Sequence, residues 1–338
     1  MALKIGVVGT GKMGQDHIER LASSVANAQV VAVSDVDVEQ AKRMADAVGT
    51  ARVYSEGHDL VGDDEVQAVL VASPGFTHAD YVLACIAANK PVLCEKPLAP
   101  TTEACLRVVE AEAALPGRLV QVGFMRRYDD GYRAVKAALA AGDIGVPLLL
   151  HCTHRNPSVA TLGAGFTSDM LLTDSVVHEI DVTRWLLGQE ITAATVLTPR
   201  RSSLAAENLQ DPQLVLLETD GSVLVDVECF VSCQYGYDIR CELVGESGTV
   251  ALPDQAGIRV RQEGRSSTRV PADFRSRFAA AYHAELQEWV DDLLQGNVGG
   301  PSAWDGYATT AVAERCVEAL ETGRRVVVDL ARRPALYG

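Results

Sequence analysis

Basic and aromatic residues are scarce in this chain of 338 residues. Lysine and arginine number 30 against 45 aspartates and glutamates, which gives a formal net charge of −15, and aromatic residues make up 5%. An acidic chain without a Lys/Arg-rich block repels phosphate backbones and anionic membrane surfaces. The low aromatic content argues against a site built from stacked bases. We therefore expect neither nucleic acid nor a membrane as a partner.

Long apolar runs and paired cysteines are also lacking. No uninterrupted apolar run approaches the roughly 20 residues that span a bilayer. The eight cysteines include no C-x-x-C pair, which predicts reduced, mostly buried thiols. Residues 1–9 run directly into a strand and do not have the layout of a signal peptide. These absences predict a cytoplasmic protein.

The first third of the chain alternates short apolar strands with helices. Strands are expected at 4–9, 30–35, 66–73, 91–95 and 119–124, and helices at 13–23, 38–48, 78–89 and 102–114. Unbroken Val, Leu and Ile strands separated by helices are typical of a parallel sheet covered on both faces. We predict an α/β fold that begins with a doubly wound (Rossmann) domain at residues 1–124.

The pattern changes after residue 125. Helices are expected at 130–141, 173–187, 274–295 and 302–322. Strand-like runs with hairpin turn signals follow one another from 192 to about 271, which indicates a large, mostly antiparallel sheet. The prediction is a C-terminal α+β domain at residues 125–338, whose helix at 302–322 could pack back on the first domain. We expect the site in the cleft between the domains.

The turn after the first strand has the sequence Gly9-Thr-Gly11-Lys12-Met13-Gly14. Gly9 allows a tight turn, Gly11 lets the backbone approach a pyrophosphate, and Gly14 lets helix and strand pack closely. The following helix presents unpaired N–H groups and a partial positive charge to the phosphates. Because strand, turn and helix occur in this order, the turn predicts a dinucleotide site rather than a purely structural turn.

Asp35 ends the second expected strand. A carboxylate at this place accepts hydrogen bonds from the ribose hydroxyls of NAD and repels the 2′-phosphate of NADP. Asp37 adds negative charge or is an ordinary turn aspartate, and no arginine immediately follows Asp35. The sequence therefore predicts NAD as the cofactor.

Two clusters could carry the chemistry. Lys96 follows a buried strand at the sheet edge where doubly wound folds bind ligands, and it could stabilise a developing alkoxide or be a solvated strand-end lysine. Asp174, His178 and Asp181 share one helical face by their spacing. His178 could remove a hydroxyl proton with Asp174 orienting its ring. A structural histidine beside a helix N-terminal carboxylate is an equally good interpretation.

Two polar strings could line a pocket. The string from His151 through His154 and Asn156 to Pro157 follows an apolar run, and suits a wall that binds several hydroxyls or an ordinary polar loop. Tyr235-Gly-Tyr237 could supply another hydroxyl or only core aromatics. No closed set of ligands accompanies the Asp and His of the helical cluster, so we expect no metal.

Together these motifs resemble the glucose–fructose oxidoreductase/inositol dehydrogenase (Gfo/Idh/MocA) family over essentially the whole chain. The motifs that carry the resemblance are Gly9–Gly14, Ser73-Pro74-Gly-Phe-Thr-His78, Glu95-Lys96-Pro97 and Asp174-x-x-x-His178. Further strings are most similar to members that oxidise myo-inositol: His154–Pro157, His178–Asp181, Tyr235–Asp238 and Ala303–Gly306.

The resemblance implies NAD-dependent oxidation of a cyclic polyol, with myo-inositol converted to 2-keto-myo-inositol. It implies that His178 is the general base, Asp174 its partner and Lys96 the residue that polarises the reacting oxygen. The residues that it implies for the other ring hydroxyls are Arg126, His154, Asn156, Asp181 and Tyr237. The residues that it implies along the nicotinamide and its ribose are Ser73, Pro74, His78 and Glu95. Family members use no metal and are commonly homotetramers packed through the sheet faces of the second domain.

Three other functions stay open. Another inositol isomer or a pyranose such as glucose differs from myo-inositol by few hydrogen bonds. Tyr132-x-x-x-Lys136 has the spacing of short-chain dehydrogenases, but the glycine turn does not match theirs, and both residues could simply lie on a solvent-edge helix. A non-catalytic NAD-binding regulator would be expected to lack Lys96, Asp174 or His178, and all three are present.

Overall fold

The computed structural model describes residues 2–49, 52–159, 165–253 and 259–338. The chain forms two compact units. Unit 1 comprises Met1–Phe124, Tyr282–Thr310 and Leu330–Gly338, and unit 2 comprises Met125–Ala281 and Ala311–Asp329. The chain therefore first leaves unit 1 after residue 124, and two later segments belong to it, one of which includes the start of the helix expected at 302–322.

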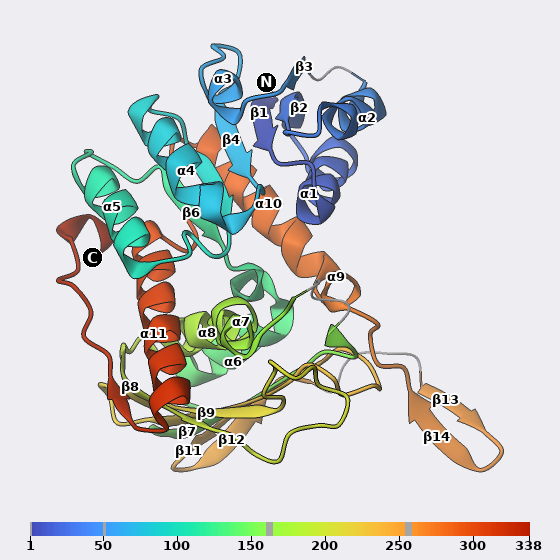
Figure 1. The fold of residues 1–338 in the computed structure, drawn as a ribbon, viewed down its shortest axis with the longest axis vertical. Helices are drawn as coiled ribbons and strands as arrows, with labels where there is room; N and C mark the ends of the chain where they lie inside the picture. The colour runs from blue at the N-terminus through green and yellow to red at the C-terminus, as the bar shows by residue number, and fades with distance from the viewer. Residues whose placement is uncertain (1, 50–51, 160–164, 254–258) are drawn as a thin grey trace. The chain divides into compact units, whose positions relative to one another are not determined.

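Unit 1 is built on a six-stranded parallel sheet (Figure 1). Its strands are β1 (Leu3–Val8), β2 (Ala28–Ser34), β3 (Arg52–Tyr54), β4 (Ala68–Val71), β5 (Val92–Glu95) and β6 (Val120–Gly123). Its N-terminal helices are α1 (Lys12–Ser23), α2 (Val38–Val48), α3 (Gly57–Val61), α4 (His78–Ala87) and α5 (Thr102–Ala113). The strand order β3-β2-β1-β4-β5-β6 confirms the predicted doubly wound sheet. The sequence analysis did not predict β3 and α3.

The core of unit 1 joins segments that are far apart in the sequence. Ile5 of β1 and Ile18 of α1 are completely buried in one apolar cluster with Leu286 and Trp289 of α10 (Ala279–Leu294). Leu286, Trp289, Val290 and Leu293 recur with helical periodicity, so they form one apolar stripe. The cluster therefore places the unit 1 part of α10 on the same face of the sheet as α1 and α2.

Unit 2 contains a seven-stranded sheet of order β12-β11-β7-β10-β9-β8-β15. Its strands are β7 (Pro147–Arg155), β8 (Ile191–Leu197), β9 (Gln213–Thr219), β10 (Leu224–Phe230), β11 (Asp238–Gly245), β12 (Gly248–Ala251) and β15 (Val326–Val327). Among the strand pairs that the described residues form in this sheet, only β7–β10 is parallel, which confirms the mostly antiparallel prediction. A separate hairpin, β13 (Arg259–Gln262) with β14 (Arg265–Thr268), is exposed along its whole length.

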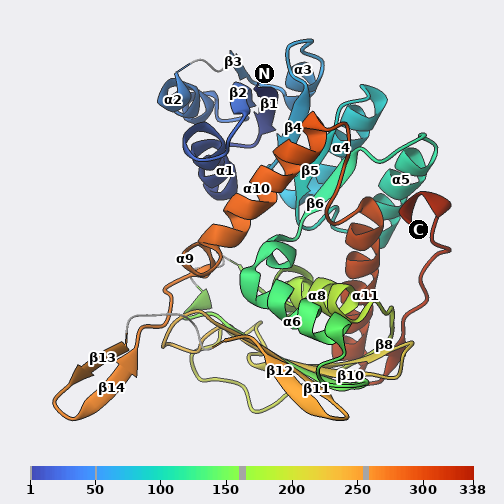
Figure 2. The same ribbon diagram turned by 180° about the vertical axis from the view of Figure 1, so that it is seen from behind.

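Helices cover one face of this sheet. They are α6 (Asp130–Ala141), α8 (Val177–Leu187) and the unit 2 part of α11 (Ala303–Thr322), as Figures 1 and 2 show. Strand β7 includes most of the polar string that follows the apolar run, up to Arg155. Because side chains alternate along a strand, Leu150, Cys152 and His154 are buried while His151 and Thr153 point to the other face. His154 therefore lies on the helix-covered side.

Two predicted helices are interrupted. The expected helix 173–187 begins earlier, as α7 (Ser168–Met170), passes through a π-helical turn (Leu171–Ser175) and continues as α8. In that turn the Val176 N–H donates to the Leu171 carbonyl at 3.1 Å, a step of five residues. The expected helix 274–295 is split into α9 (Phe274–Arg277) and α10. The side chain of Asp273 caps α9 by accepting a hydrogen bond from the Ser276 N–H.

The cysteines are all free and seven of the eight are buried, as the sequence predicted. Across the part of the chain that the structure describes, no helix combines the length and apolar character needed to cross a membrane.

Glu112 of α5 is a buried carboxylate on which unit 1 depends. Its Oε1 accepts hydrogen bonds from the N–H groups of Leu119 and Val120, each at 2.6 Å, and the Tyr337 hydroxyl donates to Oε2 at 2.7 Å. Because Glu112→Ala leaves the N–H groups of Leu119 (part-buried) and Val120 (buried) without this acceptor, we expect it to lower the free energy of unfolding by about 2–5 kcal/mol. Urea unfolding measures the change, with the exposed Glu110→Ala on the same helix as the control. Equal stability of the two variants would contradict this assignment.

Candidate active site

The glycine turn after β1 has the geometry that a pyrophosphate needs. Gly9 has a φ of +94°, and a Cβ on Gly14 would lie 1.9 Å from the Gly9 carbonyl oxygen, so neither position accepts a side chain. A Cβ on Gly11 would meet no described atom within 4 Å. Gly11 is also the N-cap of α1 and contributes no capping side chain. The helix N-terminus is therefore open to an anionic group, and its N–H groups and dipole suit a phosphate.

Asp35 follows β2 and is fixed by this turn. Its Oδ2 accepts hydrogen bonds from the N–H and hydroxyl of Thr10 at 2.7 and 2.8 Å, and its Oδ1 accepts from the Asp37 N–H at 3.0 Å. Partial burial raises the pKa of Asp35, but the hydrogen bonds from Thr10 and Asp37 outweigh it and lower the pKa below its usual value. The carboxylate is therefore charged, as selection against a 2′-phosphate requires. Asp37 accepts from the Gln40 N–H at 3.0 Å and caps α2, which agrees with an ordinary turn aspartate.

A buried pair joins α1 to the end of β5. His17 is completely buried, and its Nε2 lies 2.7 Å from Glu95 Oε1. Glu95 Oε2 accepts a hydrogen bond from the backbone N–H of Lys96 at 3.1 Å. Burial raises the pKa of Glu95, but the hydrogen bond and charge of His17 and the charge of Lys96 bring it below the usual value. This pair fixes the backbone from which Lys96 extends.

Sequence reasoning did not identify His17. The signal was present, because His17 lies three residues after Gly14 and next to the buried Ile18, on the face of α1 that packs against the sheet. A polar residue on an apolar helix face needs a buried partner.

The loop between β4 and α4 contains Ser73, Pro74 and His78. The Ser73 and Thr77 hydroxyls hydrogen-bond each other at 2.7 Å. The His78 ring lies 2.7 Å from the Pro97 carbonyl oxygen and 2.8 Å from the Ser73 carbonyl oxygen, and it is 2% exposed. His78 therefore ties the loops that follow β4 and β5, and its contact with a cofactor stays a prediction.

Unit 2 brings His154 of β7, His178 of α8 and Tyr237 into one buried cluster. The ring centroids of His154 and His178 lie 6.5 Å apart, and Tyr237 meets His154 edge-on at 5.8 Å. Asn156 directly follows β7 and is 4% exposed, and its Oδ1 has no hydrogen-bond partner among the described residues. This arrangement combines a possible base with several neutral polar groups, as binding of a polyhydroxylated ring requires. Asp174 lies half-buried in the π-helical turn, so its pairing with His178 stays a prediction.

Two buried ion pairs hold α8 against the residues that follow β6. Arg126 pairs with Glu179, and both side chains are 1% exposed. Arg127 binds both oxygens of Asp181 at 2.9 and 2.5 Å. Sequence reasoning expected Arg126 and Asp181 to contact substrate and did not identify Glu179. Substrate contact by Arg126 and Asp181 stays a prediction, and these pairings favour a supporting role.

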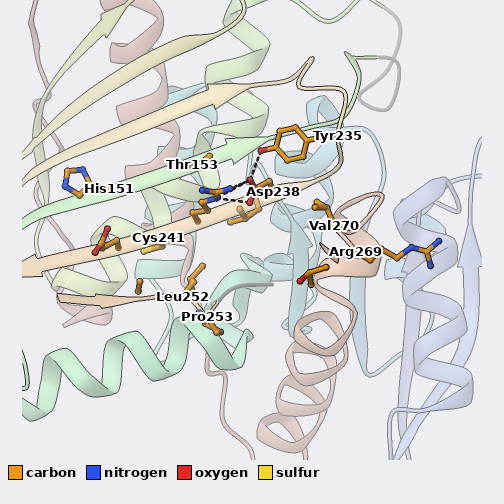
Figure 3. A pocket seen from close by; sticks show the side chains of 14 residues that line it. His151, Thr153, Tyr235, Asp238, Cys241, Leu252, Pro253, Arg269 and Val270 are labelled. Atoms are coloured by element: carbon orange, nitrogen blue, oxygen red, sulfur yellow. Dashed lines mark hydrogen bonds and ion pairs between the residues drawn. The ribbon is translucent and has the colours of Figure 1, made fainter. Parts of the chain in front are cut away.

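Tyr235 lies apart from this cluster, on the outer face of the sheet. Its side chain is 48% exposed, and its hydroxyl donates to Asp238 Oδ2 at 2.6 Å, as Figure 3 shows. These residues line a hollow of about 470 Å³ between β7, β11 and the base of the β13–β14 hairpin. Asp238 there also binds Arg240 at 2.8 Å. Neither His154 nor His178 lines this hollow, so it is not the candidate active site.

The short-chain dehydrogenase alternative loses support. Tyr132 is 1% exposed, so the expected solvent-edge helix is wrong for this residue, and burial holds the pKa of its hydroxyl well above the usual range. Lys136 lies over the Trp185 ring at 4.4 Å. A phenol that resists deprotonation is poorly suited to act as a base. Within the described ranges, no three His, Cys, Asp or Glu side chains group in a way that could hold a metal ion.

Comparison with known proteins matches both parts of the chain to one family. The oxidoreductase family with an NAD-binding Rossmann fold (Gfo/Idh/MocA) matches residues 3–124, and its C-terminal alpha/beta domain matches residues 136–330. Inositol 2-dehydrogenase 3 of Saccharopolyspora erythraea is 54% identical over 338 residues, which cover 100% of this chain and 99% of that protein.

Two solved structures from Lactobacillus casei are similar. One is myo-inositol dehydrogenase in complex with NAD(H) and myo-inositol, with a TM-score of 0.97, 38% identity and 100% coverage of both chains. The other is scyllo-inositol dehydrogenase with NAD(H) and scyllo-inositol, with a TM-score of 0.90 and 26% identity over 97% of this chain and 99% of that one.

The hydrogen bonds of Asp35 generate a prediction about the cofactor. We expect Asp35→Ala to raise the dissociation constant of NADH at least tenfold, because the ribose loses a charged acceptor, and to reduce discrimination against NADPH. Fluorescence titration with each nucleotide measures both effects. Asp37→Ala is the control, since losing a helix cap costs about 1 kcal/mol of stability without touching the ribose. An unchanged NADH dissociation constant in Asp35→Ala would show that the ribose assignment is wrong.

Proposed function

Since the chain belongs to the Gfo/Idh/MocA oxidoreductase family and carries that family's NAD-binding domain, we propose that it is an NAD-dependent dehydrogenase of myo-inositol. The product would be 2-keto-myo-inositol with formation of NADH. The name of the 54% identical relative and the ligands of the 38% identical structure support this substrate.

One observation of the structure supports this proposal. His154, His178 and Tyr237 bring polar hydrogen-bonding groups together in unit 2, Asn156 lies two residues beyond His154, and each is at most 7% exposed. A cyclic polyol presents a hydroxyl on every ring carbon, so it can satisfy several such groups at once. A carboxylate or phosphate is typically bound by an arginine that no protein carboxylate neutralises. Here Arg126 and Arg127 are paired with carboxylates.

Three residues would carry the reaction. NAD, when bound, supplies the hydride acceptor. His178 would take the proton of the reacting hydroxyl, and Asp174 would stabilise the imidazolium that forms. Lys96 would donate a hydrogen bond to the same oxygen, and its charge would stabilise the developing alkoxide. His154, Asn156 and Tyr237 would bind hydroxyls that do not react and so orient the ring.

Removal of the base tests this mechanism. We expect His178→Ala to lower kcat by about 10²–10⁴-fold, because proton removal then depends on water, while the NADH dissociation constant stays within about twofold. The measurements are NADH absorbance with myo-inositol and fluorescence titration with NADH. His58→Ala, at an exposed position of helix α3 of unit 1, is the control and should retain the wild-type kcat. Turnover close to wild type in His178→Ala would remove this residue from the mechanism.

The ring isomer is the second point to test, because a similar structure binds scyllo-inositol. Inversion of one hydroxyl changes a few hydrogen bonds, so we expect kcat/KM to be at least tenfold higher for myo-inositol than for scyllo-inositol, D-chiro-inositol or glucose. A polyol panel with NADH absorbance as the readout measures the ratios. A higher kcat/KM for another polyol would identify that polyol as the preferred substrate. NADH binding without turnover of any polyol would favour a non-catalytic regulator.

We also infer a cytoplasmic homotetramer that packs through the outer face of the unit 2 sheet. Buried free cysteines are compatible with a reducing compartment. Helices cover one face of the sheet, and Leu224 of β10 and Leu149 of β7 are neighbours in register on the other, 42% and 37% exposed. An apolar area on an otherwise uncovered sheet face is typical of an interface.

A charge placed on this outer face tests the assembly. We expect Leu224→Asp to convert a four-chain species into smaller ones, because the carboxylate would lose its water in the interface. Light scattering during gel filtration measures the mass. Leu294→Asp, at the equally exposed end of α10, is the control and should leave the mass unchanged. A wild-type monomer, or a Leu224→Asp tetramer, would contradict the inference.

A further inference from the structure

Glu179 of α8 is a buried carboxylate to which the proposed mechanism gives no role. It follows His178 in the sequence, and its side chain is 1% exposed. Burying a carboxylate is costly unless charged partners and hydrogen bonds compensate for the lost water. Glu179 has both, since Arg126 pairs with Oε1 and His154 Nδ1 lies 3.1 Å from Oε2. Burial raises the pKa of Glu179, but the charge of Arg126 and the hydrogen bonds from His154 and Arg126 outweigh it and bring the pKa to about 2. The carboxylate is therefore charged at every working pH.

These contacts determine which nitrogen of His154 carries the hydrogen in the neutral ring. A carboxylate can only accept a hydrogen bond, and the Arg126 guanidinium can only donate one. His154 Nδ1 lies 3.1 Å from Glu179 Oε2 and 3.3 Å from Arg126 Nη2. The shorter, charge-assisted contact is with the acceptor, so Nδ1 donates and carries the hydrogen. Nε2 is then left with a lone pair that accepts a hydrogen bond.

Stability alone does not explain this carboxylate. Arg127 and Asp181 already join α8 to the residues after β6, through two hydrogen bonds. A second buried ion pair at the same junction contributes little further stability to the fold, because an apolar pair of similar volume often stabilises a fold equally well. The Arg126–Glu179 pair, besides joining the two segments, contacts His154 through both of its members.

We propose that Glu179 is a positioning residue that holds the hydrogen of His154 on Nδ1, so that Nε2 accepts a hydrogen bond from a ring hydroxyl that does not react. The proposal rests on the polyol dehydrogenase function proposed above. His154 then selects a hydroxyl that points its hydrogen toward Nε2, and Glu179 acts only through His154. A contact to a hydroxyl that does not react is made in the ground state and the transition state alike, so its loss raises KM more than it lowers kcat.

The first experiment separates positioning from support of the fold. We expect Glu179→Gln to raise the KM for myo-inositol at least tenfold, with kcat within about threefold and the NADH dissociation constant within about twofold of wild type. Glu179→Asp keeps the charge, so its KM should lie between those of Glu179→Gln and the wild type. Glu190→Gln is the matched control, because Glu190 also pairs with an arginine of α8, Arg184, at 2.6 Å. A wild-type KM in Glu179→Gln, or an equal rise in Glu190→Gln, overturns the proposal.

A double-mutant cycle tests whether Glu179 acts through His154. We expect His154→Ala to raise the KM at least as much as Glu179→Gln, and the double variant to be no worse than His154→Ala alone. Effects that multiply in the double variant would show that Glu179 contacts the substrate directly or acts on another residue.

The third experiment needs no variant of Glu179 and no substrate. In wild-type protein with ¹⁵N-labelled histidine, we expect the His154 ring to show a protonated Nδ1 and an unprotonated Nε2, assigned by the signals lost in His154→Gln. The opposite tautomer, or a ring protonated on both nitrogens, overturns the proposal even if Glu179→Gln does not fold. If no polyol is oxidised but this tautomer is observed, the proposed function has failed while the positioning of His154 stands.

Discussion

The buried hydrogen bond between His17 and Glu95 connects the two parts of unit 1 that the chemistry requires. Helix α1 begins at the glycine turn that suits a pyrophosphate, and β5 ends at Lys96. Because His17 holds one oxygen of Glu95 and the Lys96 N–H holds the other, the backbone of Lys96 is fixed relative to α1, whose N-terminus is the proposed pyrophosphate site. Placement of the lysine therefore depends on a histidine 79 positions earlier in the sequence.

Unit 2 uses the same device. In the pairs Arg126–Glu179 and Arg127–Asp181, a buried carboxylate of α8 is neutralised by an arginine. Both arginines lie at the start of the unit, where the chain leaves β6. A pair of this kind contributes little net stability, but it requires fixed geometry of every group that it touches. One such group is His154, which the alternation of β7 already directs to the helix-covered face. Rigid secondary structure and a charged pair together orient the polar groups of the site.

The sequence was sufficient for the parts of this architecture that depend on local chemistry. The glycine turn, Asp35 and the strand before Lys96 follow from spacing and strand periodicity. The π-helical turn before α8 was not predictable, because one inserted hydrogen-bond step leaves the apolar pattern almost unchanged. Glu179 and Arg126 could not be paired from sequence, because their contact joins a turn after β6 to a helix 53 residues later. Residue type alone does not distinguish a buried, paired arginine such as Arg126 from an exposed arginine that binds substrate. The distinction needs the three-dimensional structure.

The proposed function depends on the transfer of a hydride from a ring carbon of myo-inositol to NAD. The most direct test is to incubate the enzyme with myo-inositol deuterated at C2 and NAD⁺, and to analyse the reduced nicotinamide by NMR and mass spectrometry. The account predicts one deuterium at C4 of the dihydronicotinamide, on a single face of the ring. Reduced nucleotide without deuterium, or no reduced nucleotide at all, would contradict it.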